Sequence, residues 1–264
     1  MVLRDISIKS IISWLKDYMK ENSSEPDRTP VVIGISGGKD SSVVAALCVR
    51  AFGAGRIIPV LLPHGIQADI DKSFLLLKHL GLNQKCYKYI NKDISKSFKV
   101  LLPYKWNSNP ALGVNRNTLA RIRMIMLYQE ADLHGGRVAN TSNLSERYIG
   151  WTTKWGDQCG DFSLLGNMTC TEVVTLGRRL GLPKELYAKV PEDGLSGKTD
   201  EENFGFTYKE LDTYLLTSKG TPEILEKIQN LHETRIHKNC VDIPTYNVFT
   251  KVISDINNNK KNKQ

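Results

Sequence analysis

The sequence lacks the long apolar segments and the cysteine patterns on which several protein classes depend. Among its 264 residues no apolar run approaches the ~20 residues that a membrane-spanning helix needs. Residues 1–17 contain no apolar core of a signal peptide. The five cysteines are widely spaced and never arranged as C-x-x-C, which argues against a disulfide framework, a structural zinc site and a redox pair. We therefore expect a cytoplasmic protein with no membrane partner.

The chain is basic but otherwise ordinary in composition. Its net charge is +8, with 41% hydrophobic and 24% charged residues, as in a globular protein. Three of the eight positive charges are lysines of the polar tail 257–264, which has no acidic residue and leaves +5 for residues 1–256. A basic body favours polyanionic partners such as nucleotides, and equally nucleic acid. The length fits one large domain or two small ones, and we expect a single domain over 1–256 with a disordered tail.

Short β-branched runs alternate with helical periodicity through the first half of the chain. Such alternation is typical of an α/β fold, a doubly wound parallel sheet with helices on both faces. Ligands bind such sheets at the carboxyl ends of the strands, so the loops after Ile35, Leu62 and Ala139 are expected to carry the chemistry. Pro59 argues against a central position for the second strand. Strands are expected at 30–35, 57–62, 86–90 and 137–141, and helices at 5–21, 41–53, 69–80 and 115–133.

The last third of the chain is predicted to be helical. Helices are expected at 171–180 and 207–216, and Thr221-Pro222 opens another. Between the first two, residues 190–206 contain one proline and three glycines among charged residues. That composition suits either a mobile lid or a surface loop.

The segment Gly34–Ser41, which reads Gly-Ile-Ser-Gly-Gly-Lys-Asp-Ser, joins the first predicted strand to a helix. Adjacent glycines let the backbone approach an anion, and the helix N-terminus presents N–H groups with a positive dipole end. It is not a Walker A loop, because Asp40 follows Lys39 where that motif has Ser or Thr. A carboxylate among phosphate donors is repulsive unless a cation intervenes, so Asp40 is expected to bind Mg²⁺. The alternative is a glycine turn capped by Ser41 or Asp40.

Ser-Gly-Gly-x-Asp-Ser after a first strand resembles the loop of the N-type ATP pyrophosphatases, which holds the pyrophosphate released from ATP. The second half narrows the resemblance to the ammonia-dependent NAD synthetase family, over roughly residues 8–247. The motifs that carry it are Asn117–Met124, Thr141–Glu146, Thr153–Asp157 with Asp161, Gly181–Pro183, Thr199–Glu202, Gly205–Tyr208 and His237-Lys238. Without that resemblance, Thr141 is more simply a helix cap and Glu146 a residue of the helix's solvated face.

The resemblance implies a site, a reaction and an assembly. The fold is expected to be adenine-nucleotide α-hydrolase-like with a helical C-terminal part. The chain is expected to amidate deamido-NAD with free ammonia, through an adenylate that releases AMP and pyrophosphate, as a homodimer with deamido-NAD near the subunit boundary. The expected ATP contacts are Gly34, Ile35, Ser36, Gly37, Gly38, Lys39, Asp40, Ser41 and Thr141, with Asp40 and Glu146 as Mg²⁺ ligands. The expected deamido-NAD contacts are Arg121, Lys154, Asp161, His237 and Lys238.

Two positions depart from the family pattern. Cys170 stands where many members have a lysine near the ATP phosphates, and Glu192 stands where many have a small hydroxyl residue. Lys198 is a candidate to supply the missing charge if its loop closes over the site. Asp157 is a candidate, by position, for deprotonating ammonium.

Three other functions compete with this interpretation. A thiolating or PAPS-reductase-like enzyme of the same superfamily often needs paired or C-terminal cysteines, which the chain lacks. The departures at Cys170 and Glu192 suggest a nucleotide-binding regulator without catalysis. Such a regulator needs no pair of metal ligands, so the presence of both Asp40 and Glu146 argues against it. A nucleic-acid module rests on charge alone, so we expect no nucleic-acid partner.

Overall fold

The structure is a computed structural model that describes residues 3–67, 70–82, 90–102, 113–188 and 199–239. The strands are β1 (Val31–Gly34), β2 (Ile57–Leu61), β3 (Ile90–Asn91), β4 (Arg137–Asn140) and β5 (Phe162–Ser163). The helices are α1 (Ile8–Glu21), α2 (Lys39–Phe52), α3 (Ile70–His79), α4 (Ser95–Leu101), α5 (Gly113–His134), α6 (Leu144–Tyr148), α7 (Cys170–Arg179), α8 (Lys184–Tyr187), α9 (Asp200–Phe204), α10 (Tyr208–Thr217) and α11 (Pro222–Arg235), with 3-10 turns η1 (Ala54–Arg56) and η2 (Ile236–Asn239).

The described strands pair in parallel in the order β3-β2-β1-β4-β5. The chain moves outward from β1 through β2 to β3 and then returns to the other side of β1 with β4. Because the direction of winding reverses between β1 and β4, the loops that follow these two strands diverge and leave a crevice. The predicted doubly wound parallel sheet is confirmed, and the crevice lies at the predicted strand ends.

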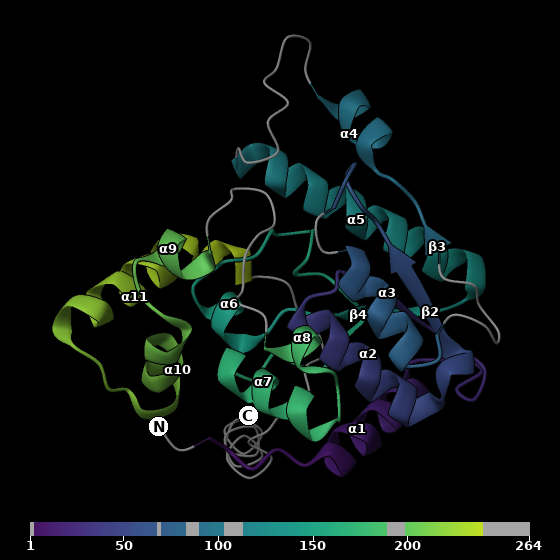
Figure 1. The fold of residues 1–264 in the computed structure, drawn as a ribbon, viewed down its shortest axis with the longest axis horizontal. Coiled ribbons are helices and arrows are strands. Elements are labelled where there is room, and N and C mark those ends of the chain that lie inside the picture. Colours follow the sequence, from purple (N-terminus) through teal and green to yellow (C-terminus); the bar gives the residue numbers. More distant parts are fainter. Residues whose placement is uncertain (1–2, 68–69, 83–89, 103–112, 189–198, 240–264) are drawn as a thin grey trace, which may run out of the picture.

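Each of the central strands contributes to two hydrophobic cores. Val31 and Ile33 of β1 pack against α1, α2, α7 and α8, whereas Val32 packs against α4 and α5 on the other face. Figure 1 shows α1, α2, α7 and α8 grouped below the sheet and α5 above it. Alternation between two buried faces explains the continuous apolar character of these strands. Within the described residues no helix is both long and apolar enough to cross a membrane.

A third core belongs to the C-terminal helices. Phe204, Phe206 and Tyr208 pack with Leu211 and Ile228, joining α9, α10 and α11 to α6 and to the start of α7. These helices form the yellow-green group at the left of Figure 1. The predicted helical C-terminal part is confirmed, and it stands beside the carboxyl ends of β1 and β4.

Pro59 lies in an interior strand, which corrects the expectation from its missing N–H. Ile35 donates to the carbonyl of Val60 at 2.8 Å and Lys92 to that of Leu61 at 3.0 Å, so alternate residues of β2 face β1 and β3. Pro59 therefore faces the β3 side, one residue before Val60 pairs with Ile90. Its pairing with β1 loses no donor.

Other element boundaries also differ from the prediction. The predicted strand 86–90 survives as Ile90 at the start of β3, and residues 86–89 lie outside the described part. The short strand β5 was not predicted. Residues 200–204, expected to be loop, form α9, because Thr199 and Glu202 make a capping box at its start. Lys198, Glu192 and the tail 257–264 lie outside the described residues.

Candidate active site

A cleft of about 890 Å³ opens at the carboxyl ends of β1 and β4. Its volume lies in the upper part of the range for small-molecule sites, about 300–1,000 Å³. The lining residues come from the loops after β1, β2 and β4, from one side of α5, and from the C-terminal helices. Most of the predicted ATP contacts line it, namely Gly34, Ile35, Ser36, Gly38, Ser41 and Thr141, together with Glu146.

The loop after β1 is shaped to receive an anion. Gly37 has φ = 78°, a left-handed conformation that favours glycine. Gly38 is the N-cap of the 14-residue helix α2 and has no side chain with which to cap it. The hydroxyl of Ser42 donates to the Gly38 carbonyl at 2.7 Å, and the hydroxyls of Ser36 and Ser41 lie 2.9 Å apart. The N-terminal amides of α2 are therefore directed at the cleft without an internal cap.

Two carboxylates from opposite sides of the crevice meet at one ammonium group. Lys39 Nζ lies 2.7 Å from Asp40 Oδ2 and 3.7 Å from Glu146 Oε1. Asn143 Nδ2 donates to Asp40 Oδ1 at 3.0 Å, which joins the loop after β4 to the start of α2. The side chains of Asp40 and Glu146 are 18% and 17% exposed. The structure thus brings together the two residues predicted from separate motifs to bind a metal.

Glu146 also caps the helix on which it lies. The side chain of Asn143 accepts from the Glu146 amide at 3.0 Å, and Glu146 Oε2 accepts from the Asn143 amide at 3.3 Å. The cap of α6 is therefore Asn143 and not Thr141, which leaves Thr141 on the cleft wall. This capping box fixes the direction in which the Glu146 carboxylate points.

The acidic pair is short of positive charge. Burial, and then the neighbouring Asp40, raise the pKa of Glu146 to about 8, although Lys39 opposes the rise. Burial alone lowers the pKa of Lys39, but the adjacent carboxylates outweigh it and hold that pKa well above its ordinary value. Proteins commonly hold Mg²⁺ through one or two carboxylates together with substrate phosphates. Two partly buried carboxylates beside an anion-binding helix N-terminus fit that ion.

A third carboxylate lies next to this pair on the C-terminal helices. Asp200 accepts from Trp151 Nε1 at 3.1 Å and from the Tyr208 hydroxyl at 2.9 Å, and it lines the cleft. The Tyr208 ring lies 5.6 Å from Lys39 Nζ. Burial raises the pKa of the Tyr208 hydroxyl, and Glu146 and Asp200 raise it further. The tyrosine therefore stays a neutral donor that connects α10 to the acidic pair.

Cys170 lies at the start of α7, behind the acidic pair. The Cys170 amide donates to Ser145 Oγ at 2.9 Å, and the Ser145 hydroxyl donates in turn to Asp212 at 2.5 Å. Burial raises the pKa of the Cys170 thiol, while Lys39 opposes the rise. Cys170 thus presents a neutral thiol at the start of α7, and among the described residues Lys39 is the cation in contact with the acidic pair.

The residues predicted to contact deamido-NAD fall into two groups. Lys238 lines the cleft and donates to the carbonyls of Gly150 and Thr152 at 2.9 and 3.0 Å. Arg121, Lys154 and His237 contact one another, because Arg121 Nε donates to the Lys154 carbonyl at 3.1 Å and Lys154 Nζ donates to the His237 carbonyl at 3.3 Å. None of these three is a lining residue of the cleft.

The two remaining predicted aspartates have different environments. Asp157 lines the cleft and is exposed to it, and its Oδ1 accepts from the Thr153 amide at 2.7 Å. Asp161 instead accepts from the Val138 amide at 2.6 Å and from the Tyr128 hydroxyl at 3.3 Å. Its carboxylate therefore holds the β4–β5 edge, outside the cleft, and its contact with substrate remains a prediction.

Three arginines of the cleft were not singled out from the sequence. The guanidinium groups of Arg116 and Arg235 lie 5.9 and 5.7 Å from the Trp151 ring centroid, and Arg123 donates to the Leu62 carbonyl at 3.1 Å. All three line the cleft. They add positive charge to the cleft wall, which favours anionic ligands. The only sequence signal was the position of Arg123 within the motif 117–124.

Comparison with known proteins gives the family. A family model described as NAD synthase matches residues 7–252. The chain is 39% identical to the NH(3)-dependent NAD(+) synthetase of Thermococcus sibiricus over 81% of this chain and 82% of that one, and 37% identical to that of Methanocaldococcus jannaschii over 85% and 88%. Among solved structures, the NMN synthetase of Francisella tularensis superposes with a TM-score of 0.76 at 29% identity, covering 90% of this chain and 98% of that one. The NH3-dependent NAD synthetase of Campylobacter jejuni subsp. jejuni gives 0.69 at 26% identity, covering 90% and 98%. The chain belongs to the NAD synthase family.

Proposed function

We propose that the chain is an ammonia-dependent NAD synthetase, which amidates the nicotinate carboxylate of deamido-NAD at the expense of ATP. The observation that carries this function is that Asp40 and Glu146 meet at Lys39 beside the uncapped N-terminus of α2, next to a cleft that Glu146 lines. Family membership and the curated relatives support the same substrates. A pure nucleotide-binding regulator needs no such pair of carboxylates.

The reaction has two steps. The nicotinate carboxylate attacks the α-phosphate of ATP and forms an acyl adenylate with release of pyrophosphate, and ammonia then displaces AMP. Neither step needs a protein nucleophile, so the task of the protein is to position two polyanions and to neutralise their phosphates. Mg²⁺ held by Asp40 and Glu146 would neutralise charge on the phosphates of ATP. The amides of α2 bind the β- and γ-phosphates, and Arg116, Arg235 and Lys238 bind the dinucleotide.

Asp157 is positioned to act on ammonium within this cleft. It lines the cleft and is exposed to it, so its carboxylate can reach a bound ammonium ion. Its backbone carbonyl accepts from Asn140 and Ser142, both at 2.9 Å, so the residue is anchored to the end of β4. We assign it the deprotonation of ammonium.

The function is tested by a steady-state assay with two nitrogen donors and two acceptors. We expect NAD, AMP and pyrophosphate from ATP, Mg²⁺, deamido-NAD and ammonium, and at most a trace from glutamine. Nicotinic acid mononucleotide is the matched second acceptor, because the Francisella tularensis structure is that of an NMN synthetase. A higher kcat/KM for the mononucleotide than for deamido-NAD would show that the chain is an NMN synthetase instead. Absence of AMP with both acceptors would contradict the amidation function.

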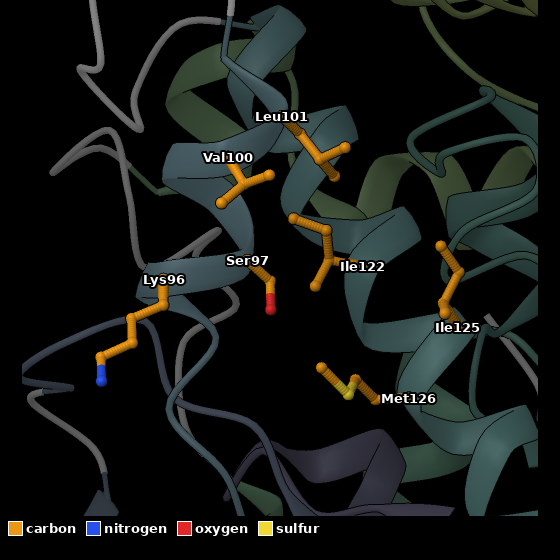
Figure 2. A pocket seen from close by; sticks show the side chains of 7 residues that line it. All are labelled: Lys96, Ser97, Val100, Leu101, Ile122, Ile125 and Met126. Atoms are coloured by element: carbon orange, nitrogen blue, oxygen red, sulfur yellow. The ribbon is translucent and has the colours of Figure 1, made fainter.

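We further propose that the enzyme is a homodimer joined through α4 and α5. Val100, Leu101 and Ile125 are 83, 58 and 64% exposed, and they line a groove of about 450 Å³ between the two helices. Figure 2 shows these side chains along the groove, together with Ile122 and Met126 of α5. Exposed apolar side chains of this kind can be buried against a second copy of the chain. The other side of α5 lines the cleft, so this interface would put deamido-NAD close to the subunit boundary.

Sedimentation of an Ile125→Glu variant tests the dimer. A charge in the groove is expected to shift the wild-type dimer to a monomer, with a rise in KM for deamido-NAD. Phe74→Glu on α3, which packs on the opposite face of the sheet, is the control and should remain dimeric. A monomeric wild type, or a dimeric Ile125→Glu variant, would contradict this interface.

A further inference from the structure

Lys39 is a buried cation in an unfavourable place. It is the first residue of α2, and its side chain is only 5% exposed. A positive charge at a helix N-terminus opposes the helix dipole, and burial of an ammonium group costs solvation. The neighbouring carboxylates must therefore compensate for both effects, so the position of Lys39 depends on them.

The ammonium lies between the two carboxylates assigned to the metal. It contacts Asp40 at 2.7 Å and approaches Glu146 to 3.7 Å, with the Tyr208 ring on one side. Among the described residues, the thiol of Cys170 also acts on this ammonium, and Asp200, which accepts from the Tyr208 hydroxyl, acts on Glu146. The ammonium thus occupies the space between the carboxyl groups of Asp40 and Glu146 that a divalent ion would share.

We propose that the Lys39 ammonium is a resident counter-cation of the metal site, which a divalent ion entering with ATP displaces towards the phosphates. This inference rests on the proposed function, because it takes Asp40 and Glu146 as metal ligands. Without substrates the ammonium keeps the two carboxylates in place. A divalent ion cannot share the same carboxylate oxygens with a nearby ammonium, because like charges repel at short range. ATP offers the displaced ammonium new anionic partners, so ion and nucleotide promote each other's binding.

The test is a titration of the substrate-free enzyme with Mn²⁺, in which free Mn²⁺ is followed by electron paramagnetic resonance. Removal of the competing ammonium in Lys39→Met should tighten Mn²⁺ binding about tenfold, a coupling of ordinary size. The methylene analogue of ATP with a carbon between the α- and β-phosphates should tighten Mn²⁺ binding more in the wild type than in this variant. The control is Lys92→Met, which breaks the Lys92–Glu130 pair at 2.6 Å outside the site and should bind Mn²⁺ like the wild type. Equal Mn²⁺ affinity in the wild type and Lys39→Met would overturn the proposal.

Two further measurements keep the proposal testable if Lys39→Met folds poorly. Lys39→Arg keeps the charge and should bind Mn²⁺ as weakly as the wild type. A crystal of the wild type with Mn²⁺ and the ATP analogue should show the ion on Asp40 and Glu146 and Lys39 Nζ beyond hydrogen-bond distance of both. The ammonium in its present place beside a bound ion would refute displacement. Glu146→Gln tests the metal assignment separately from the displacement of Lys39. If this variant still binds Mn²⁺ like the wild type, Glu146 is not a metal ligand. If Mn²⁺ binding is lost, the assignment of Glu146 as a ligand stands.

Discussion

The guanidinium group of Arg4 contacts both carboxylate oxygens of Glu172, across 168 positions of the chain. Glu172 also closes the capping box of α7 with Thr169, so the N-terminal segment is tied to the helix that begins at Cys170. The two side chains are 16% and 1% exposed. Breaking a buried pair by removing one partner leaves an uncompensated charge. This contact therefore connects the N-terminal segment to the back of the active site.

Arg4→Met is expected to lower the free energy of unfolding by about 3 kcal/mol, because Glu172 is left buried without its partner. Urea denaturation followed by circular dichroism measures the change. Asp5→Asn is the control, since it removes the exposed Arg179–Asp5 pair at 3.8 Å, in which Asp5 is 99% exposed. Such a surface pair contributes about 0–1 kcal/mol. An equal loss in both variants would show that the Arg4 contact is not a buried ion pair in solution.

The same pair predicts sensitivity to acid. Burial alone raises the pKa of Glu172, but hydrogen bonds from Arg4 and from the Thr169 amide outweigh it and lower the pKa below its ordinary value. The unfolded state therefore binds the proton more tightly, and the stability from this group is lost as the pH falls through the folded-state pKa. We expect the stability difference between the wild type and Glu172→Gln to be large at pH 6 and to shrink towards pH 3. Glu226→Gln, at an exposed position, is the control.

Gly150 couples the fold of the C-terminal helices to the cleft. It has φ = 61°, and an added Cβ would lie 2.4 Å from the Cβ of Arg235. Gly150→Ala is expected to displace the end of α11 and with it Lys238, which donates to the Gly150 carbonyl. KM for deamido-NAD should rise more than KM for ATP, and stability should fall by more than the ~1–2 kcal/mol of a left-handed residue.

Gly135→Ala is the matched control for that substitution. Gly135 also has φ = 61°, but nothing lies within 4 Å of an added Cβ. Gly135→Ala should lose only the ~1–2 kcal/mol that a left-handed alanine costs, and its KM values for deamido-NAD and ATP should be unchanged. Equal effects at the two positions would show that the contact with Arg235 does not set the position of the C-terminal helices.

The sequence predicted those parts of the site that depend on local chemistry. A strand, two adjacent glycines and a helix specify the anion loop without knowledge of the rest of the fold. The separate motif that contains Glu146 was assigned to the metal through family resemblance, and the fold brings that residue to Asp40. The cap of α6 was not predictable in the same way, because Thr141 and Asn143 both precede the helix and the contact of Asn143 with Asp40 is a tertiary one.

The features that were missed depend on contacts between distant segments. Strand β5 has two residues, too few to show alternation, and it exists by pairing with β4. The place of Asp161 follows from that pairing, since its carboxylate accepts from the Val138 amide of β4. In contrast, α9 was readable, because Thr199 and Glu202 form the same Thr-x-x-Glu signature that correctly predicted α10. A loop was predicted because of the glycines at 194, 197 and 205, but the local capping signature decides the structure of residues 200–204.

Exchanging Lys39 and Cys170 tests whether the site needs one cation that either position can supply. Cys170→Lys alone puts a second ammonium beside that of Lys39 and should destabilise the fold by roughly 1–3 kcal/mol and reduce AMP release by at least about tenfold. Lys39→Gln alone leaves the carboxylates without their cation and should also lose activity. In the double variant the cation count is restored, so stability and turnover should both exceed those of Cys170→Lys. Rates of AMP release and thermal midpoints of all four proteins form a double-mutant cycle, in which additive effects would show that the two positions act independently.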